Sequence, residues 1–195
     1  MSVSGDSQLQ DIRTAGGNFT LRTGDLRLEG AGVQVAGGSG AISIEASGAL
    51  FMAEGSEIST HSGAVTVSAQ EDVEVSVIHS GSGDVHLGGR DIVLRDVGLY
   101  SQLGGDVSVL ATGKLVMQEG TRVNSDAGRL VLTVGSDLLM QDGTQTASDS
   151  GDVKLTLGGD GHLTQVRSNS GSIEMTADDI RLEGSGVQVL EGAGR

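Results

Sequence analysis

The stretch 105–128, GDVSVLATGKLVMQEGTRVNSDAG, decides the fold of this chain, because a second version of it, GRLVLTVGSDLLMQDGTQTASDSG, follows directly at 128–151. Each version begins with a glycine and continues with alternating aliphatic residues, an acidic residue followed by glycine, and a segment rich in serine and threonine. A sequence segment that recurs with a period of this length is typical of a solenoid, in which each repeat forms one structural unit.

The same unit recurs along nearly the whole chain. We place the start of each unit at the glycine that precedes an alternating apolar pair, and the spacings between these glycines are 23, 23, 20, 22, 23, 23 and 20 residues. The starting glycines are Gly17, Gly40, Gly63, Gly83, Gly105, Gly128, Gly151 and Gly171. Eight units of 20–23 residues therefore follow one another from residue 17 onward.

Each unit contains three short apolar patterns. The first places apolar residues two and four positions after the starting glycine, as in Val107/Val109, with a mostly polar residue between them. The second follows as in Leu115/Met117, although Gly161 replaces its first member in the seventh unit. The third, as in Val123, is weaker and is usually introduced by an acidic residue and glycine. Alternation with a period of two predicts strands with one buried face.

These patterns predict an all-β fold, a right-handed single-stranded parallel β-helix (solenoid) with about eight three-strand coils of 20–23 residues. A single unit cannot bury its apolar pairs, whereas stacked units form one continuous aliphatic column. Glycine with a positive φ is expected at the corners, and the absence of proline suits strands that all donate to a ladder. Eight coils stacked about 4.8 Å apart would form a rod of roughly 38 Å.

A longer period is also visible. The starting glycines of corresponding units are 88 residues apart, as in Gly63 and Gly151, which indicates two superrepeats, 17–104 and 105–192. We expect residues 1–16 to be an N-terminal lead-in and 17–195 to be the β-helix repeat domain. The segments DLRLEGAGVQV (25–35) and DIRLEGSGVQV (179–189) nearly coincide, but they lie 154 residues apart, outside this period.

Composition and charge exclude several classes of function. The net charge of −14, from 12 basic and 26 acidic residues, makes nucleic acid and an anionic membrane surface poor partners. No segment has the length and apolarity of a membrane span, and the N-terminus does not resemble a secretion signal. The chain contains three aromatic residues, Phe19, Phe51 and Tyr100, which leaves few rings for a substrate cleft. It has no cysteine, so no disulfide framework is expected.

The repeats resemble those of filamentous-haemagglutinin-type adhesins. The segment 105–128 is the most similar to them, followed by GAISIEASGALFMAEGSEISTHSG (40–63), and the resemblance extends over about residues 17–190. It implies a bacterial exoprotein of the two-partner-secretion kind, whose repeats form a right-handed β-helical shaft on the cell surface. The Asn-Pro motifs of the family's secretion domain are missing from this proline-free chain, so we expect an excerpt of a longer shaft, with open strand edges at both ends.

No catalytic, cofactor-binding or metal-binding residue is assigned. Five acidic residues precede the second strand and would form either a cation column or, as we expect, local Asx-type turns: Asp25, Asp72, Asp91, Asp137 and Asp179. The histidines at 61, 79, 86 and 162 lack ligand-like spacing, and His86 is expected to point outward. Lysine occurs only at 114 and 154, and the outward column contains only two threonines, Thr20 and Thr66, which is too few for an ice-binding ladder.

The sequence therefore predicts a structural shaft segment of a large bacterial surface-exposed or secreted adhesin or exoprotein, which holds distal binding or toxin modules away from the cell. The alternative is a carbohydrate-, protein- or calcium-binding adhesive module that acts through an outward face. We expect no enzymatic activity and no cofactor. The expected partners are a host-cell, neighbouring-cell or glycan receptor and flanking modules of a longer chain, with neither nucleic acid nor membrane insertion. The expected location is extracellular or at the bacterial cell surface.

Overall fold

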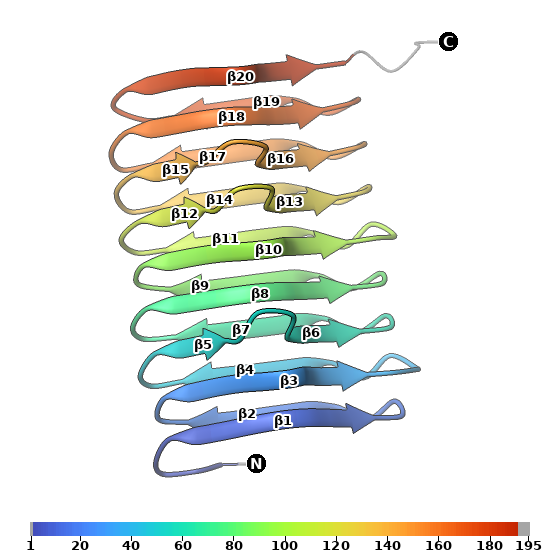
Figure 1. The fold of residues 1–195 in the computed structure, drawn as a ribbon. Coiled ribbons are helices and arrows are strands. Elements are labelled where there is room, and N and C mark those ends of the chain that lie inside the picture. Colours follow the sequence, from blue (N-terminus) through green and yellow to red (C-terminus); the bar gives the residue numbers. More distant parts are fainter. Residues whose placement is uncertain (1, 191–195) are drawn as a thin grey trace.

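The alternating segments form strands that stack into one parallel β-solenoid of about eight turns (Figure 1). The computed structural model describes residues 2–190, apart from the side chain of Val97, and this part of the chain contains strands and no helix. In Figure 1 the near strands run to the right, the far strands run back to the left, and the chain climbs from its N-terminus at the bottom. The coil is therefore right-handed, and the predicted fold class is confirmed.

The first apolar pattern of every unit forms an eight-stranded parallel sheet, here called sheet A. Its strands are β2 (Phe19–Thr23), β4 (Ile42–Ala46), β7 (Val65–Ala69), β9 (Val85–Gly89), β11 (Val107–Ala111), β14 (Leu130–Val134), β17 (Val153–Leu157) and β19 (Ile173–Thr176). The residues two positions after each starting glycine pair with one another in an unbroken register from Phe19 to Ile173. Their side chains, and those two positions further on, point into the aliphatic core and are buried in all but the two end coils.

The second and third patterns form a twelve-stranded sheet, here called sheet B. In six coils they join into one strand: β1 (Ser7–Thr14), β3 (Leu26–Val35), β8 (Val73–Ser80), β10 (Ile92–Ser101), β18 (Gly161–Ser168) and β20 (Ile180–Val189). In the other three coils they stay separate: β5 (Leu50–Met52) with β6 (Glu57–Thr60), β12 (Leu115–Met117) with β13 (Arg122–Ser125), and β15 (Leu138–Met140) with β16 (Gln145–Ser148). The prediction of three strands in a coil therefore describes these three coils, and each of the others has two, except the first, in which β1 is the one named strand.

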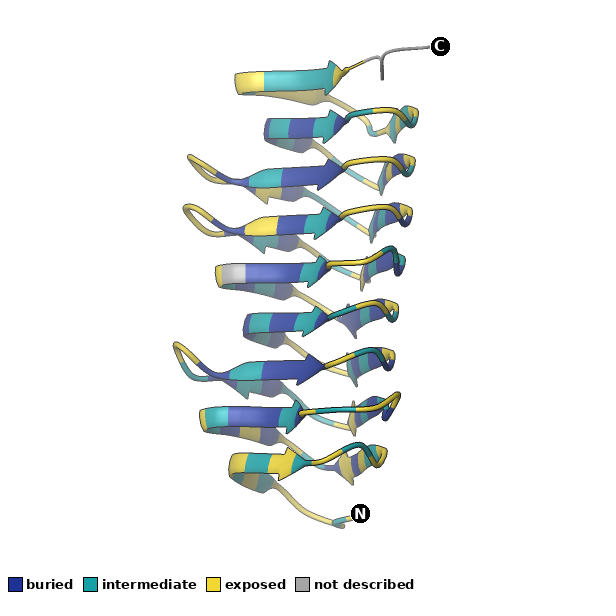
Figure 2. Ribbon diagram, turned by 90° about the vertical axis from the view of Figure 1, so that its right-hand side faces the viewer, coloured by how far each residue is buried: buried dark blue, intermediate teal, exposed yellow. Residues whose placement is uncertain are grey.

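The junction between the second and third patterns takes three forms. A loop with a left-handed glycine separates the short strands and projects from one edge of the stack (Figure 2). In β1, β3, β10 and β20 the strand continues through an irregular junction, here called a bulge, with a left-handed residue at Asp11, Gly30, Asp96 and Gly184. The strands of the two 20-residue units, β8 and β18, run straight through.

The order of these junctions follows the 88-residue period. From Gly17 the forms are bulge, loop, straight and bulge, and from Gly105 they are loop, loop, straight and bulge. Three of the four positions agree, so the second half of the chain repeats the backbone of the first. The near-identity of 25–35 and 179–189 has a separate cause, because these segments form β3 and β20, which share the bulged junction.

From Gly40 to Gly171 the starting glycines are required for close approach and not for a positive φ, whereas a Cβ at Gly17 would meet no neighbouring atom. Gly128 has an ordinary backbone conformation, but a Cβ at this position would overlap the carbonyl oxygen of Gly105 in the coil below. The expectation of left-handed corner glycines is therefore correct for the acidic-glycine pairs, such as Gly143, and wrong for the starting glycines. Here the backbones of successive corners stack directly upon one another.

The stack begins before Gly17. Residues 7–14 of the expected lead-in form β1, which pairs in parallel with β3, and Ser2 forms a bridge with Arg22 beneath sheet A. At the other end β20 finishes at Val189. Residues 191–195 of the predicted repeat domain, which include the last two residues of the second superrepeat, 105–192, lie outside the described residues.

Candidate functional site

The acidic residues before the second strand bind the backbone of the next coil. Asp25 Oδ1 accepts a hydrogen bond from the amide of Ala49 at 2.8 Å, and Asp91 Oδ1 accepts one from the amide of Lys114 at 2.7 Å. Asp137 is placed in the same way beneath the amide of Asp160. The local Asx turn expected from the sequence is therefore wrong for these three residues, because each side chain reaches upward to the following turn.

A second ladder of the same kind lies immediately before the first strand of the unit. Its acceptors are the side chains of Asn18, Asp84, Asp106 and Asp152, each bonded to an amide one coil above. These side-chain oxygens satisfy backbone N–H groups at corners, where the sheet ladder is interrupted. An oxygen that already accepts such a bond is poorly placed to become the open ligand of a cation column.

Asp72 and Asp179 behave differently from the other members of the first set. Asp72 Oδ1 accepts a hydrogen bond from Arg90 Nε at 2.9 Å, and this bond holds the pKa of Asp72 below its usual range. Both side chains are exposed, so this ion pair contributes little to stability. Asp179 belongs to the last coil of the stack, where the structure describes no coil above it.

A buried ladder of hydroxyl groups lies at the third corner, and the sequence analysis missed it. Ser148 Oγ donates to the carbonyl of Gly128 at 3.0 Å and accepts from the amide of Gly151 at 2.8 Å. Ser168 repeats this arrangement one coil higher. Other members of the ladder are Thr60, Ser80, Ser101 and Ser125, which are also buried. A serine or threonine three residues before most starting glycines was the available signal.

The four histidines lie apart, as expected from their spacing. His61 is exposed, and His86, predicted to point outward, is half-buried with Nδ1 2.8 Å from Ser108 Oγ. His162 Nε2 lies 3.0 Å from Glu183 Oε2. Among residues 2–190 no group of three or more histidine and acidic side chains is placed to hold a metal ion.

The chain's one tyrosine lies beside a histidine on the outer face of sheet B. The rings of Tyr100 and His79 stack with centroids 4.7 Å apart, and His79 Nε2 lies 2.6 Å from Glu57 Oε1. Burial, and then the negative charge of Glu57, raises the pKa of the Tyr100 hydroxyl. This raised pKa makes the tyrosine a weaker acid than usual, which is the opposite of what an activated nucleophile requires.

Arg95 joins two coils that are not neighbours in the stack. Its Nη2 donates to the carbonyl of Met52 at 2.8 Å, two coils below, and its Nη1 lies 2.8 Å from Glu74 Oε1. The guanidinium also lies 5.1 Å from the centre of the Phe51 ring. The intervening coil belongs to a short unit without a junction loop, and this leaves room for the Arg95 side chain to pass.

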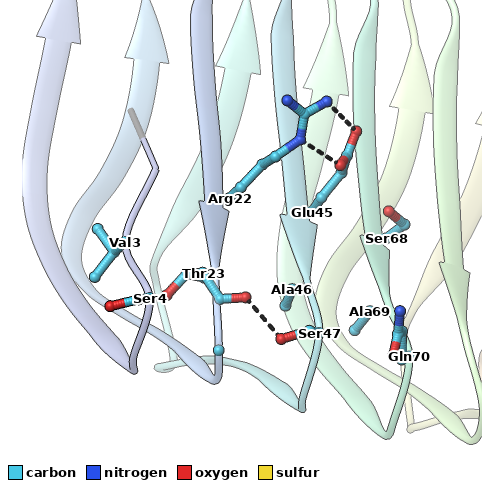
Figure 3. Close-up of a pocket in the computed structure, with 11 residues that line it drawn as sticks. Val3, Ser4, Arg22, Thr23, Glu45, Ala46, Ser47, Ser68, Ala69 and Gln70 are labelled. Atoms are coloured by element: carbon cyan, nitrogen blue, oxygen red, sulfur yellow. Dashed lines mark hydrogen bonds and ion pairs between the residues drawn. The ribbon is translucent and has the colours of Figure 1, made fainter.

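A hollow lies near the N-terminal end of the stack, at the ends of β2, β4 and β7 (Figure 3). It has a volume of about 450 Å³, and small side chains such as Ala46, Ser47 and Ala69 line it. Arg22 and Glu45 carry the charge of this hollow and neutralise each other through an ion pair of 2.7 Å between Nε and Oε2. This bond lowers the pKa of Glu45 and raises that of Arg22.

The residues around this hollow do not form a nucleophile with its base. The Ser47 hydroxyl donates to the backbone carbonyl of Thr23 at 3.2 Å, and the residues that line the hollow include no histidine, lysine or aromatic side chain. Lys114 and Lys154 lie elsewhere, near Asp137 and Glu174 respectively. The hollow can therefore seat a small polar group, but it offers no group poised to transfer a proton.

The comparisons with known proteins add no relative. No protein-family model, no curated protein and no solved structure matches this chain. Residues 2–190 contain no helix with the length and apolarity needed to cross a bilayer.

Proposed function

We propose that this chain is a rigid spacer, a shaft segment of a large bacterial surface-exposed or secreted exoprotein of the adhesin type. In this role it holds binding or toxin modules away from the cell. The observation that carries the proposal is the unbroken register of sheet A from Phe19 in β2 to Ile173 in β19. Each coil contacts the coils directly above and below it, so a bend in the rod would have to break ladder hydrogen bonds.

The side-chain ladders support the same role. Buried hydroxyl groups such as Ser148 and exposed carboxylates such as Asp91 connect each coil to its neighbour at the corners, where the backbone ladder is interrupted. The ionisable groups of the hollow at the ends of β2, β4 and β7 neutralise each other, which favours a structural role over a catalytic one. Cross-links at many of the corners are expected to stiffen the rod.

Rigidity can be measured between spin labels at the two ends. The chain has no cysteine, so Ser43→Cys in β4 and Glu174→Cys in β19 provide two unique outward labelling sites. Six strand steps separate them, which predicts a single narrow distance of about 29 Å between the backbone positions. A broad distribution of distances would contradict the proposed rigidity.

The spacer role itself requires a second experiment. The chain is inserted between a cell-surface anchor and a known binding module, and adhesion is compared with that of a flexible glycine-serine linker of equal length. We expect reach to fall stepwise as whole coils are deleted, and to depend weakly on length for the linker. Clear binding of the isolated chain to a glycan array, or to calcium in a calorimetric titration, would instead favour the adhesive module.

A further inference from the structure

The second superrepeat contains the counterpart of the Arg95 site, but without the arginine. A shift of 88 residues relates Met52 to Met140, Glu74 to His162 and Arg95 to Glu183. The backbones agree as well, because Asp96 and its counterpart Gly184 both have a positive φ, of 55° and 62°. The two sites therefore share one backbone frame and differ in the side chains that fill it.

Both sites have a backbone carbonyl at the same position, that of Met52 in the first superrepeat and that of Met140 in the second. In the first superrepeat the ladder between β5 and β8 stops at Phe51, and the next carbonyl, that of Met52, accepts a hydrogen bond from Arg95. In the second, the ladder between β15 and β18 stops at the corresponding Leu139. The carbonyl of Met140 thus lies just beyond the paired region, where Met52 meets its guanidinium.

Glu183 cannot take the place of Arg95. A carboxylate accepts hydrogen bonds and has no proton to donate to a carbonyl. Glu183 instead lies beside His162 and leaves a pocket of about 340 Å³, whose lining includes Leu139, Met140 and Asp142. In the first superrepeat Arg95 contacts the Glu74 carboxylate, the Met52 carbonyl and the apolar ring of Phe51. A carboxylate, a carbonyl and an apolar side chain also line this pocket.

The ionisable groups that line the pocket are mainly acidic. Glu119, Asp142 and Glu183 line it, and the His162 nitrogen, followed by Arg181, holds the pKa of Glu183 below its usual range. Glu183 is therefore ionised at neutral pH. Arg181 contacts it at 2.7 Å from an exposed position, and an exposed pair of this kind is readily exchanged for another partner.

We propose that this pocket binds the arginine side chain of a partner protein, in the manner in which Arg95 fills the equivalent site of the same chain. The guanidinium would donate to the Met140 carbonyl and to the carboxylates of Asp142 and Glu183, and its aliphatic stem would pack on Leu139. A guanidinium suits this set because its planar fork serves several acceptors at once, whereas a lysine ammonium is a point charge. The site would make the shaft a docking surface as well as a spacer.

The test is a titration of the isotopically labelled protein with the peptide Gly-Gly-Arg-Gly-Gly, followed by NMR. We expect the signals of Leu139, Met140 and His162 to shift, with weaker binding for the lysine peptide and none for the uncharged citrulline peptide. Binding should weaken as salt is added. Equal binding of the citrulline peptide, or no shift with the arginine peptide, would overturn the proposal.

Variants connect the binding to this pocket. His162→Glu combined with Glu183→Arg recreates the pair found at Glu74 and Arg95, so the chain's own guanidinium should fill the pocket and abolish peptide binding. Asp142→Asn is a milder change in an exposed loop and should weaken binding by about tenfold, or ~1.4 kcal/mol. Glu54→Gln, at the matching loop position of the first superrepeat, is the control and should leave the affinity unchanged. Unchanged affinity in Asp142→Asn, or an equal loss in Glu54→Gln, would show that the peptide binds elsewhere.

Discussion

Gly161 lies against Leu157, so that a Cβ at Gly161 would come within 2.8 Å of Leu157 Cδ1. Leu157 ends β17 in sheet A and Gly161 begins β18 in sheet B, so the two residues face each other across the corner of one coil. In the coil below, Val134 and Leu138 occupy these positions. Each coil therefore has one leucine at this corner, on sheet B in the coil below and on sheet A here, and the Leu157 side chain occupies space beside Gly161.

This exchange predicts a non-additive pair of substitutions. Gly161→Leu should destabilise the fold by about 1–3 kcal/mol through overpacking, and Leu157→Ala by about 2–5 kcal/mol through the cavity it leaves. The double variant Leu157→Ala/Gly161→Leu should recover most of the loss, because the volumes again match. Urea denaturation of the four proteins measures the coupling. Strictly additive losses would mean that the two side chains do not share one space.

The buried hydroxyl ladder predicts a cost for losing one serine. Ser148→Ala leaves the Gly128 carbonyl and the Gly151 amide without this partner, and we expect a loss of about 1–3 kcal/mol in the free energy of unfolding. Ser150→Ala, two residues away on the exposed corner, is the matched control and should change it by less than about 0.5 kcal/mol. A thermal or urea melt compares the two, and equal effects would remove the ladder's role.

The contacts of Arg95 predict that its loss destabilises the fold more than the loss of the exposed Arg22. Arg95→Ala removes a donor to the Met52 carbonyl and the partner of Glu74, and should cost about 1.5–3 kcal/mol. Arg22→Ala breaks an exposed ion pair with Glu45 and should cost less than about 1 kcal/mol. The measurement is again the free energy of unfolding. A loss at Arg95 no larger than that at Arg22 would show that the link across two coils adds nothing.

Repulsion between the stacked residues Asp126 and Asp149 predicts that removing one of the two charges stabilises the fold, to an extent that depends on pH. Burial, and then the charge of Asp149, raises the pKa of Asp126 above its ordinary value of 3.8. A group with a raised folded pKa favours the folded state below its unfolded pKa, and this contribution is lost as the pH rises through the folded value. Asp149→Asn removes the repelling charge and keeps an oxygen that can accept the hydrogen bond of Asn169 Nδ2.

We therefore expect Asp149→Asn to raise the melting temperature at pH 7, and the gain to vanish in acid below the ordinary pKa of aspartate. Differential scanning calorimetry across this range measures it. Asp178→Asn, on the exposed turn of the last coil, is the control and should alter the melting temperature little at either pH. A gain from Asp149→Asn that persists in acid would point to a cause other than charge repulsion.

A charge in the aliphatic column should unfold the rod. Val107→Asp places a carboxylate at a fully buried position of β11, and an unpaired charge there costs several kcal/mol. Leu110→Asp, in the same strand but 43% exposed, is the matched control and should leave the fold intact. Circular dichroism melts of the two variants decide the matter, and an unchanged melt for Val107→Asp would contradict the buried column.

Much of the fold could be read from local periodicity. The alternation in residues such as Val107 and Val109 assigns their inward face, and the regular recurrence of Gly105 and Gly128 assigns the coil, because stacking places the same demand on every unit. The ladders could not be read in this way. The position of Asp91 in the sequence predicted a local turn, but its side chain binds the amide of Lys114 in the next coil.

What the sequence by itself determined is therefore the repeat, its register and its inward aliphatic face, since these depend on spacing along the chain. The tertiary structure alone decided which groups meet between coils: Arg95 with a carbonyl two turns below, and Glu183 with His162 where the first superrepeat has an arginine. The physical reason is that contacts between coils join residues about 20 or 40 positions apart. Their geometry depends on whether the intervening junction is a loop, a bulge or a straight strand.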